Sequence, residues 1–271
     1  MERPATVLRV EDLVLGYGAG PPALDGASLE VGEGQVVSLV GPSGSGKSSL
    51  LRAVMGLQEA VSGRITLGLP RAEVGMLFQD DALLPWRSAA DNVALGLRAR
   101  GWTRERRRAE AEAWLRRVGL AGLGDRYPGR LSGGQRKRVA LAQVLILAPR
   151  LLLLDEPFSA VDAIVRRRLY QDLLGLVEGQ GIAALLVTHD LGEALALSDV
   201  VYLLSAGPRA RIVRRYDVPL PRPRDLANVR ADPRFGPMNA QLWRDLASVM
   251  GDAAADATRG AATDAARGAA A

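Results

Sequence analysis

Short apolar runs recur along the chain, and most have the length of a strand rather than of a helix. The predicted strands cover residues 6–10, 27–31, 35–40, 63–67, 74–78, 151–154, 182–188, 200–204 and 210–214. Longer stretches with helical spacing predict helices at residues 47–55, 104–118, 138–147, 165–177 and 191–197. Strands and helices alternate in the second half of the chain, which predicts an α/β fold with a mostly parallel sheet covered by helices.

The same pattern divides the chain into regions. Residues 5–217 form the predicted main domain, and residues 88–148 within it are mainly helical, so they are expected to be an insertion in the α/β core. Residues 218–249, which begin with a segment rich in proline and arginine, form a predicted C-terminal extension. Residues 250–271 are almost entirely Ala, Gly, Asp, Thr and Arg, a composition that predicts a disordered or weakly helical tail.

The net charge of +5 and the pI of about 10 suit a protein that binds nucleic acid or an anionic membrane surface. However, of the 35 lysine and arginine residues only Lys47 and Lys137 are lysine, which indicates a general enrichment in arginine. Against that background Lys47 is informative. A phosphate-binding loop needs a compact ammonium, and the planar guanidinium of arginine is not equivalent.

Two further features bear on location. The sequence contains no run of about 18 uncharged apolar residues, and its first ten residues mix charged and apolar side chains, unlike a secretory signal. There is no cysteine, so a disulfide framework and a thiolate metal site are both excluded. We therefore expect a cytoplasmic protein without a membrane-spanning segment.

A glycine-rich segment follows the apolar run at 35–40 and precedes the helix predicted at 47–55. It reads Gly41-Pro42-Ser43-Gly44-Ser45-Gly46-Lys47-Ser48, followed by Ser49. Glycines at these positions let backbone N–H groups approach phosphate oxygens, and the helix N-terminus adds its positive dipole end. The spacing predicts that Lys47 contacts the β- and γ-phosphates of ATP and that the Ser48 hydroxyl is a Mg²⁺ ligand.

Two adjacent carboxylates, Asp155 and Glu156, end the apolar run at 151–154. A strand end of this kind places Asp155 beside the phosphates, where a hard cation that retains several waters suits it. Glu156 is then in a position to polarise the attacking water.

A third motif, Leu131-Ser132-Gly133-Gly134-Gln135, lies between the other two and resembles the signature of ABC-type ATPase subunits. The resemblance covers roughly residues 5–217. It implies a P-loop NTPase fold of the ABC ATPase type, with an antiparallel β subdomain and a helical insertion. It also implies a homodimer in which Ser132, Gly134 and Gln135 contact the ATP held by the other subunit.

The resemblance extends to single positions. Tyr17 is similar to the aromatic residue that stacks on adenine, although an ordinary aromatic at a strand end would look the same. Gln79 resembles the glutamine that senses Mg²⁺ and water. Residues 159–162 resemble the loop that links the two ATP sites. His189, the only histidine, resembles the histidine that contacts the γ-phosphate.

A segment around Leu84-Pro85-Trp86 is similar to the nitrate, sulfonate and taurine importer group, as is the segment Pro221-Arg222-Pro223-Arg224-Asp225. That group implies transmembrane permease subunits, a periplasmic or extracellular solute-binding protein and a place at the cytoplasmic face of the membrane. Trp86 is then expected near the groove for a permease helix, with packing inside the helical insertion as the alternative.

Two other functions compete. A soluble ABC ATPase acting on nucleic acid or ribosomes would use the basic run at 104–108, but such a run on a helix is more often a solvated face, so no nucleic acid is expected. An exporter subunit is disfavoured by the Leu84-Pro85-Trp86 segment.

Overall fold

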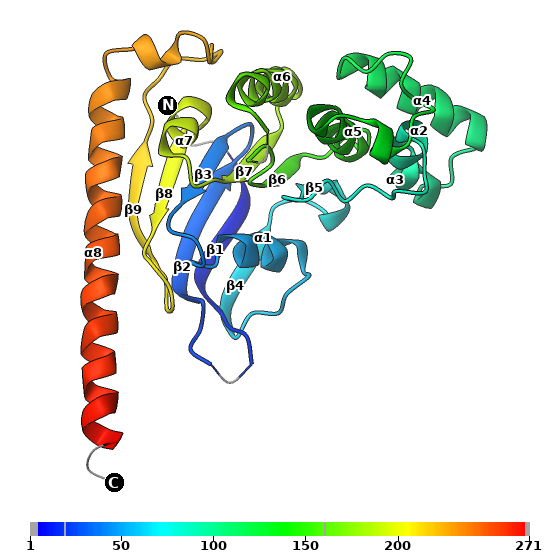
Figure 1. Ribbon diagram of the computed structural model, residues 1–271. Coiled ribbons are helices and arrows are strands. Elements are labelled where there is room, and N and C mark those ends of the chain that lie inside the picture. The colour runs from blue at the N-terminus through cyan, green and yellow to red at the C-terminus, as the bar shows by residue number, and fades with distance from the viewer. Residues whose placement is uncertain (1–4, 19, 160, 269–271) are drawn as a thin grey trace.

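The computed structural model describes the backbone of residues 5–18, 20–159 and 161–268 and the side chains up to Gly251. Two sheets lie at its centre (Figure 1). The smaller is antiparallel, in the order β2–β1–β4. Its strands are β1 (Thr6–Leu15), β2 (Leu24–Gly32) and β4 (Ser62–Leu67). This sheet is the antiparallel subdomain that the resemblance implies.

The larger sheet has the order β5–β6–β7–β3–β8–β9. Its strands are β3 (Val36–Val40), β5 (Val74–Leu77), β6 (Leu151–Asp155), β7 (Ala183–Val187), β8 (Val200–Leu204) and β9 (Ile212–Asp217). All neighbours in it pair in parallel except β8 and β9, which form an antiparallel hairpin. Strands β3, β6, β7 and β8 are buried at every position, as expected for a parallel sheet covered on both faces.

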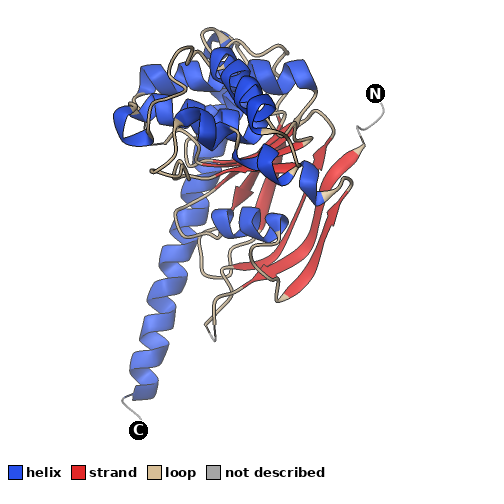
Figure 2. Ribbon diagram, turned by 90° about the vertical axis from the view of Figure 1, so that its right-hand side faces the viewer, coloured by secondary structure: helices blue, strands red, loops and turns tan. Residues whose placement is uncertain are grey.

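Helices complete two hydrophobic layers. Between the sheets and α1 (Lys47–Met55) lies one core cluster, and the helices on the other face of the large sheet enclose the second. Those helices are α2 (Ala89–Val93), α3 (Leu95–Ala99), α4 (Arg104–Arg117), α5 (Gly133–Leu145), α6 (Ala163–Gln180) and α7 (Leu191–Leu197). The first four fall within residues 88–148, and Figure 2 shows most of the helices gathered above the strands, whereas the long C-terminal helix runs down past them. Three 3₁₀ turns occupy Arg71–Glu73, Pro128–Arg130 and Val229–Ala231.

Helix α5 begins five residues earlier than the sequence pattern predicts, at Gly133 instead of residue 138. The reason is a capping box. The Ser132 hydroxyl accepts the N–H of Gln135 at 3.3 Å, and the Gln135 side chain accepts the N–H of Ser132 at 2.9 Å. These reciprocal bonds satisfy two backbone donors and start the helix despite its two leading glycines.

The C-terminal region also differs from the expectation. Helix α8 (Phe235–Gly268) runs without a break through most of the stretch predicted to be disordered or weakly helical. Its alanine content explains the difference, because alanine has the highest intrinsic helix propensity. Residues 269–271 lie outside the described residues. Figure 1 shows α8 lying beside β9 and continuing away from the sheets.

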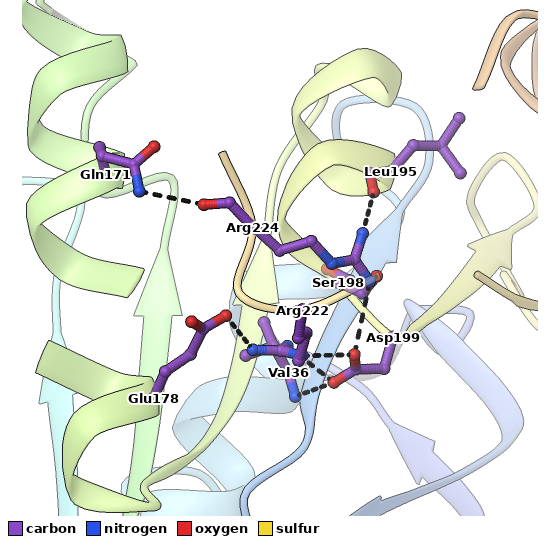
Figure 3. A network of polar contacts seen from close by, with 8 residues as sticks. All are labelled: Val36, Gln171, Glu178, Leu195, Ser198, Asp199, Arg222 and Arg224. Carbon is purple, nitrogen blue, oxygen red and sulfur yellow. Dashed lines mark hydrogen bonds and ion pairs between the residues drawn. The ribbon is translucent and has the colours of Figure 1, made fainter. Parts of the chain in front are cut away.

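The segment before α8 is attached to the core by two arginines that share one carboxylate (Figure 3). Arg222 donates to both oxygens of Asp199 at 2.8 Å and contacts Glu178 of α6 at 2.5 Å. The fully buried Arg224 donates to the carbonyl oxygen of Ser198 at 2.8 Å, at the end of α7. Asp199 also accepts the N–H of Val36 at 2.9 Å, so the extension is fixed to the strand that leads into the glycine-rich loop.

Candidate active site

Most of the predicted site residues meet at one edge of the large sheet. In the parallel register Leu39 of β3 lies beside Val187 of β7, and Asp155 of β6 lies on the other side of Val187. The carboxyl ends of these strands are therefore level, the usual place for a ligand in an open α/β sheet. A cavity of about 530 Å³ opens there. It is lined by Tyr17, Ala23, Ser43, Gly44, Gly46, Lys47, Ser48, Ser49, Gln79, Glu156 and His189.

A larger cavity of about 880 Å³ lies between α6, α7 and the extension. No residue predicted for the site lines it, so the smaller cavity is the one with the relevant chemistry.

The turn between β3 and α1 depends on glycine at Gly46. This residue caps the start of α1 in the left-handed region, with φ at 85°, and a Cβ there would lie 2.8 Å from the Leu24 Cγ. Gly44 has a similar conformation, with φ at 77°. No described side chain caps the N-terminus of α1. Its first N–H groups therefore point into a cradle that suits the oxygens of an anion.

Lys47 is the first residue of α1 and is almost completely buried. Its Nζ donates to the carbonyl oxygens of Gly41 at 2.9 Å and Pro42 at 2.7 Å. Burial lowers the pKa of Lys47, while the nearby Glu156 and Asp155 oppose that shift. The ammonium is thus placed inside the loop, where phosphate oxygens could replace the two carbonyl groups. Ser45 is fully buried beneath it.

Ser48 and Asp155 are in direct contact, although 107 positions separate them. The Ser48 hydroxyl donates to Asp155 Oδ1 at 2.8 Å, and Asp155 is buried at the end of β6. Burial raises the pKa of Asp155, and the hydrogen bond from Ser48 offsets part of that rise. A buried carboxylate beside a hydroxyl is the oxygen-donor pair that Mg²⁺ accepts when phosphates and water complete its coordination.

Glu156 and His189 both line the cavity and are in direct contact. Their side chains meet at 3.0 Å between Glu156 Oε2 and His189 Nδ1. The Glu156 backbone has φ at 42°, unusual for a residue other than glycine, and its N–H donates to the carbonyl oxygen of Val187 at 3.0 Å. The strained turn aims the carboxylate at the imidazole, whose ring is about half exposed.

Tyr17 and Gln79 lie at the rim. The Tyr17 hydroxyl is 2.6 Å from the Ser49 Oγ, and 59% of the residue is exposed. A flat, exposed ring beside the phosphate cradle is in the right place to stack on a base. Gln79 lies two residues after the end of β5 and lines the same cavity. Thirteen positions were predicted to contact nucleotide. Tyr17 and six of the nine on the loop line this cavity, and the other three, Gly41, Pro42 and Ser45, contact the Lys47 Nζ.

The three signature residues lie elsewhere. Ser132, Gly134 and Gln135 form the start of α5 and do not line the cavity. Ser132 is exposed, whereas Gln135 uses its side-chain oxygen in the capping box. A single chain therefore does not join these residues to the phosphate loop. Ala160, within the predicted linking loop at 159–162, lies outside the described residues.

Two polar contacts next to the site were not predicted. Lys137 of α5 donates from its buried Nζ to the carbonyl oxygen of Gln79 at 2.5 Å. Arg166 of α6 pairs with Glu193 of α7 at 3.1 Å, close to His189. A signal for the first was present in the sequence, because Lys137 is one of only two lysines in an arginine-rich chain. The second has no comparable signal.

Comparison with known sequences agrees with this geometry. Residues 24–159 match the ABC transporter family. The chain belongs to that family. The aliphatic sulfonates import ATP-binding protein SsuB 2 of Rhizobium johnstonii is 43% identical over 241 residues, which cover 89% of this chain and 91% of that protein. The taurine import ATP-binding protein TauB of Chromobacterium violaceum is 44% identical over 238 residues, 84% of this chain and 91% of that relative.

Solved structures of ABC proteins have the same fold. Clostridium perfringens cbiO1, part of the ABC transporter complex cbiONQ, has a TM-score of 0.70 at 29% identity, over 79% of this chain and 89% of its own. A dimeric ATP-binding cassette in a post-hydrolysis state, bound to ADP and Pi, has a TM-score of 0.69 at 28% identity, over 78% of this chain and 98% of its own.

These similarities confirm the predicted ABC ATPase fold, and as a member of this family the chain binds and hydrolyses ATP. Among the described residues, no helix combines the length and the apolar character needed to cross a membrane.

Proposed function

We propose that this ABC ATPase drives the import of small organosulfonates, such as taurine or an alkanesulfonate, with nitrate-type anions as the wider class of cargo. The observation that carries the proposal is the pair of relatives above 40% identity that are named import ATP-binding proteins, one for aliphatic sulfonates and one for taurine. Both kinds of solute carry a sulfonate group on carbon. The import relatives do not favour the exporter or the nucleic-acid alternatives.

The nucleotide would lie in the cavity at the sheet edge. Tyr17 would stack on adenine, and the loop from Gly41 to Ser49 would surround the phosphates with N–H groups. Lys47 would exchange its two carbonyl partners for oxygens of the β- and γ-phosphates. The cavity volume of about 530 Å³ supports this placement, because it falls in the range of small-molecule sites.

The contact between Ser48 and Asp155 supports a Mg²⁺ site, and Gln79 stands at the rim of the same cavity. When bound there, the cation would neutralise charge on the β- and γ-phosphate oxygens. Ser48 would supply a direct oxygen ligand. Asp155 would bind the cation or its water, and Gln79 would bind the cation or orient a water from the rim of the cavity.

For hydrolysis we assign two roles. The Glu156 carboxylate would polarise the attacking water, and His189 would contact the γ-phosphate. Their contact at 3.0 Å supports this pairing, because it fixes the orientation of both groups before the substrate arrives. Lys47 would offset the charge that develops on the β-phosphate of the leaving ADP.

We further propose that two copies of the chain form the working unit. The separation of Ser132 and Gly134 from the cavity supports this arrangement, since a second copy could bring its α5 N-terminus to the γ-phosphate. The dimeric ATP-binding cassette among the similar structures gives further support. The unit would sit at the cytoplasmic face of a membrane, bound to permease subunits that receive solute from a binding protein.

Growth on different sulfur sources tests the cargo. We expect that a strain lacking this gene will not grow on taurine or an alkanesulfonate as its sole sulfur source, but will grow normally on sulfate. The wild-type gene should restore growth, whereas equally expressed Lys47→Ala and Glu156→Gln variants should not. Normal growth of the deletion strain on both sulfonates would contradict the assignment of organosulfonates as cargo.

A further inference from the structure

The loop that carries Gln79 is attached to the signature helix through one buried ammonium. Lys137 lies on the second turn of α5, and only 5% of it is exposed. Its Nζ donates to the carbonyl oxygen of Gln79 at 2.5 Å and lies 3.0 Å from Asp81 Oδ1. One side chain therefore holds both ends of the segment from Gln79 to Asp81, which begins two residues after the end of β5.

Burial of the Lys137 ammonium costs free energy unless polar partners replace the water that it loses. Moving an ammonium out of water is unfavourable, and here the carbonyl group and the carboxylate supply the compensation. The neighbouring Arg136 also contacts Asp81, at 2.9 Å between Nε and Oδ2, but its side chain is 39% exposed and its Nη1 donates to the carbonyl oxygen of Leu131 at 2.9 Å. The two adjacent cations thus share the Asp81 carboxylate but differ in burial and in the second partner, which is the carbonyl group of Gln79 for Lys137 and that of Leu131 for Arg136.

We propose that Lys137 is a positioning residue for Gln79. It holds the Gln79 carbonyl group toward α5 and so directs the Gln79 side chain into the nucleotide cavity. The same ammonium connects the first turns of α5, where Ser132 begins the helix, to the loop between β5 and the helical insertion. A displacement of α5 would therefore move Gln79 with it. This inference rests on the role of Gln79 at Mg²⁺ that we proposed above.

The test is the Mg²⁺ dependence of ATP hydrolysis by the purified chain at a fixed ATP concentration. For Lys137→Met we expect the half-saturating Mg²⁺ concentration to rise at least about threefold and turnover to fall about tenfold, because small misplacements of a catalytic group are expensive. ATP affinity without Mg²⁺ should stay within about twofold, since the phosphate loop is untouched.

Two more variants separate positioning from stability. Lys137→Gln keeps an N–H donor for the Gln79 carbonyl group, so it should retain more activity than Lys137→Met, and it carries the test if Lys137→Met fails to fold. The matched control is Arg136→Met, which loses a cation at the same carboxylate and should leave the Mg²⁺ requirement unchanged. Melting temperatures of all variants are measured on the same preparations.

Gln79→Ala serves as the reference. If it raises the Mg²⁺ requirement and Lys137→Met raises it equally, with no additional rise in the double variant, the two residues act as one unit. An unchanged requirement in Lys137→Met alone would overturn the positioning role and leave that of Gln79 intact. An unchanged requirement in both would overturn the role of Gln79 and with it this inference.

Discussion

At the scale of single residues, the site holds two opposite charges that burial disfavours. Desolvation lowers the pKa of Lys47 and raises the pKa of Asp155, so each group would ionise more easily in the unfolded chain. Both residues lie beside the space assigned to phosphate and metal. The protein therefore maintains charges that reduce its own stability, and a bound nucleotide with its cation would offset that reduction.

Substitution of Asp155 by asparagine should separate stability from activity. The folded pKa of Asp155 is raised, so ionised Asp155 opposes folding, and this loss grows as the pH rises through the folded pKa. Without nucleotide, Asp155→Asn should melt at a higher temperature than wild type at pH 7 to 8, and the difference should vanish as the pH falls to the ordinary aspartate value of 3.8. Scanning calorimetry across this range checks it.

The control for that experiment is Asp125→Asn, at a carboxylate whose side chain is 92% exposed. It should not raise the melting temperature, because an exposed surface ion pair contributes little. A wild type more stable than Asp155→Asn at pH 8 would contradict the account of burial at the site. Hydrolysis by Asp155→Asn should be nearly lost at every pH if Asp155 binds the metal.

At the scale of elements, helix α7 and strand β8 begin and end where the sequence pattern predicts, as does helix α1. Their ends carry clear local signals. Gly46 and Gly56 flank α1 in left-handed conformations, and the Asp190 side chain caps α7. Helix α5 was predicted too short because its leading glycines concealed a capping box, which depends on side-chain geometry that no hydrophobic pattern records.

The start of helix α6 is also set by a side-chain cap. The sequence pattern predicts a helix from residue 165, whereas α6 begins at Ala163. The structure places the cap one turn earlier, at Asp162, whose side chain accepts the N–H of Val165 at 3.1 Å.

The segment between β5 and α2 permits a comparison of two side chains. Trp86 is 69% exposed, so the alternative that it packs inside the helical insertion is not supported. We expect Trp86→Ala to change the free energy of unfolding by less than about 0.5 kcal/mol and to leave basal ATPase unchanged. Substrate-stimulated ATPase in membranes with the permease should fall, because an exposed aromatic residue is a typical anchor for a partner.

Asn92 is the matched position, since it supports the same segment from within. Its buried amide donates to the carbonyl oxygens of Leu84, Arg87 and Ser88 and accepts the N–H of Leu84 at 2.8 Å. Asn92→Ala should cost about 1–3 kcal/mol of unfolding free energy and should lower basal and stimulated activity together. Unchanged stimulation in Trp86→Ala would remove Trp86 from the permease contact.

At the scale of the whole molecule, the C-terminal extension is part of the folded unit. Arg224 and Asp199 belong to segments that the sequence pattern treats separately, and their contact follows only from the way α7 and β8 are placed in the fold. The sequence indicated the extension through its proline and arginine content but not its attachment. The motifs of the nucleotide cavity were predictable, in contrast, because each lies within two residues of the end of a strand.

Arg224→Met should destabilise the protein by about 2–4 kcal/mol, because it leaves the buried carbonyl groups at the end of α7 without their donor. Arg222→Met is the control. Its side chain is partly exposed and contacts only carboxylates, so the expected cost is about 1 kcal/mol or less. Urea unfolding of both variants gives the comparison. Equal costs would contradict the structural role assigned to buried Arg224.

The claim at the centre of this account is that ATP joins two copies through the phosphate loop of one and the signature of the other. Light scattering of the Glu156→Gln variant tests it directly, since loss of the carboxylate should trap the ATP-bound state. With ATP we expect a particle of twice the 28.8 kDa chain mass, and a monomer without it. Adding Ser132→Arg should abolish the dimer while the monomer still binds ATP. A dimer that survives Ser132→Arg would contradict the account.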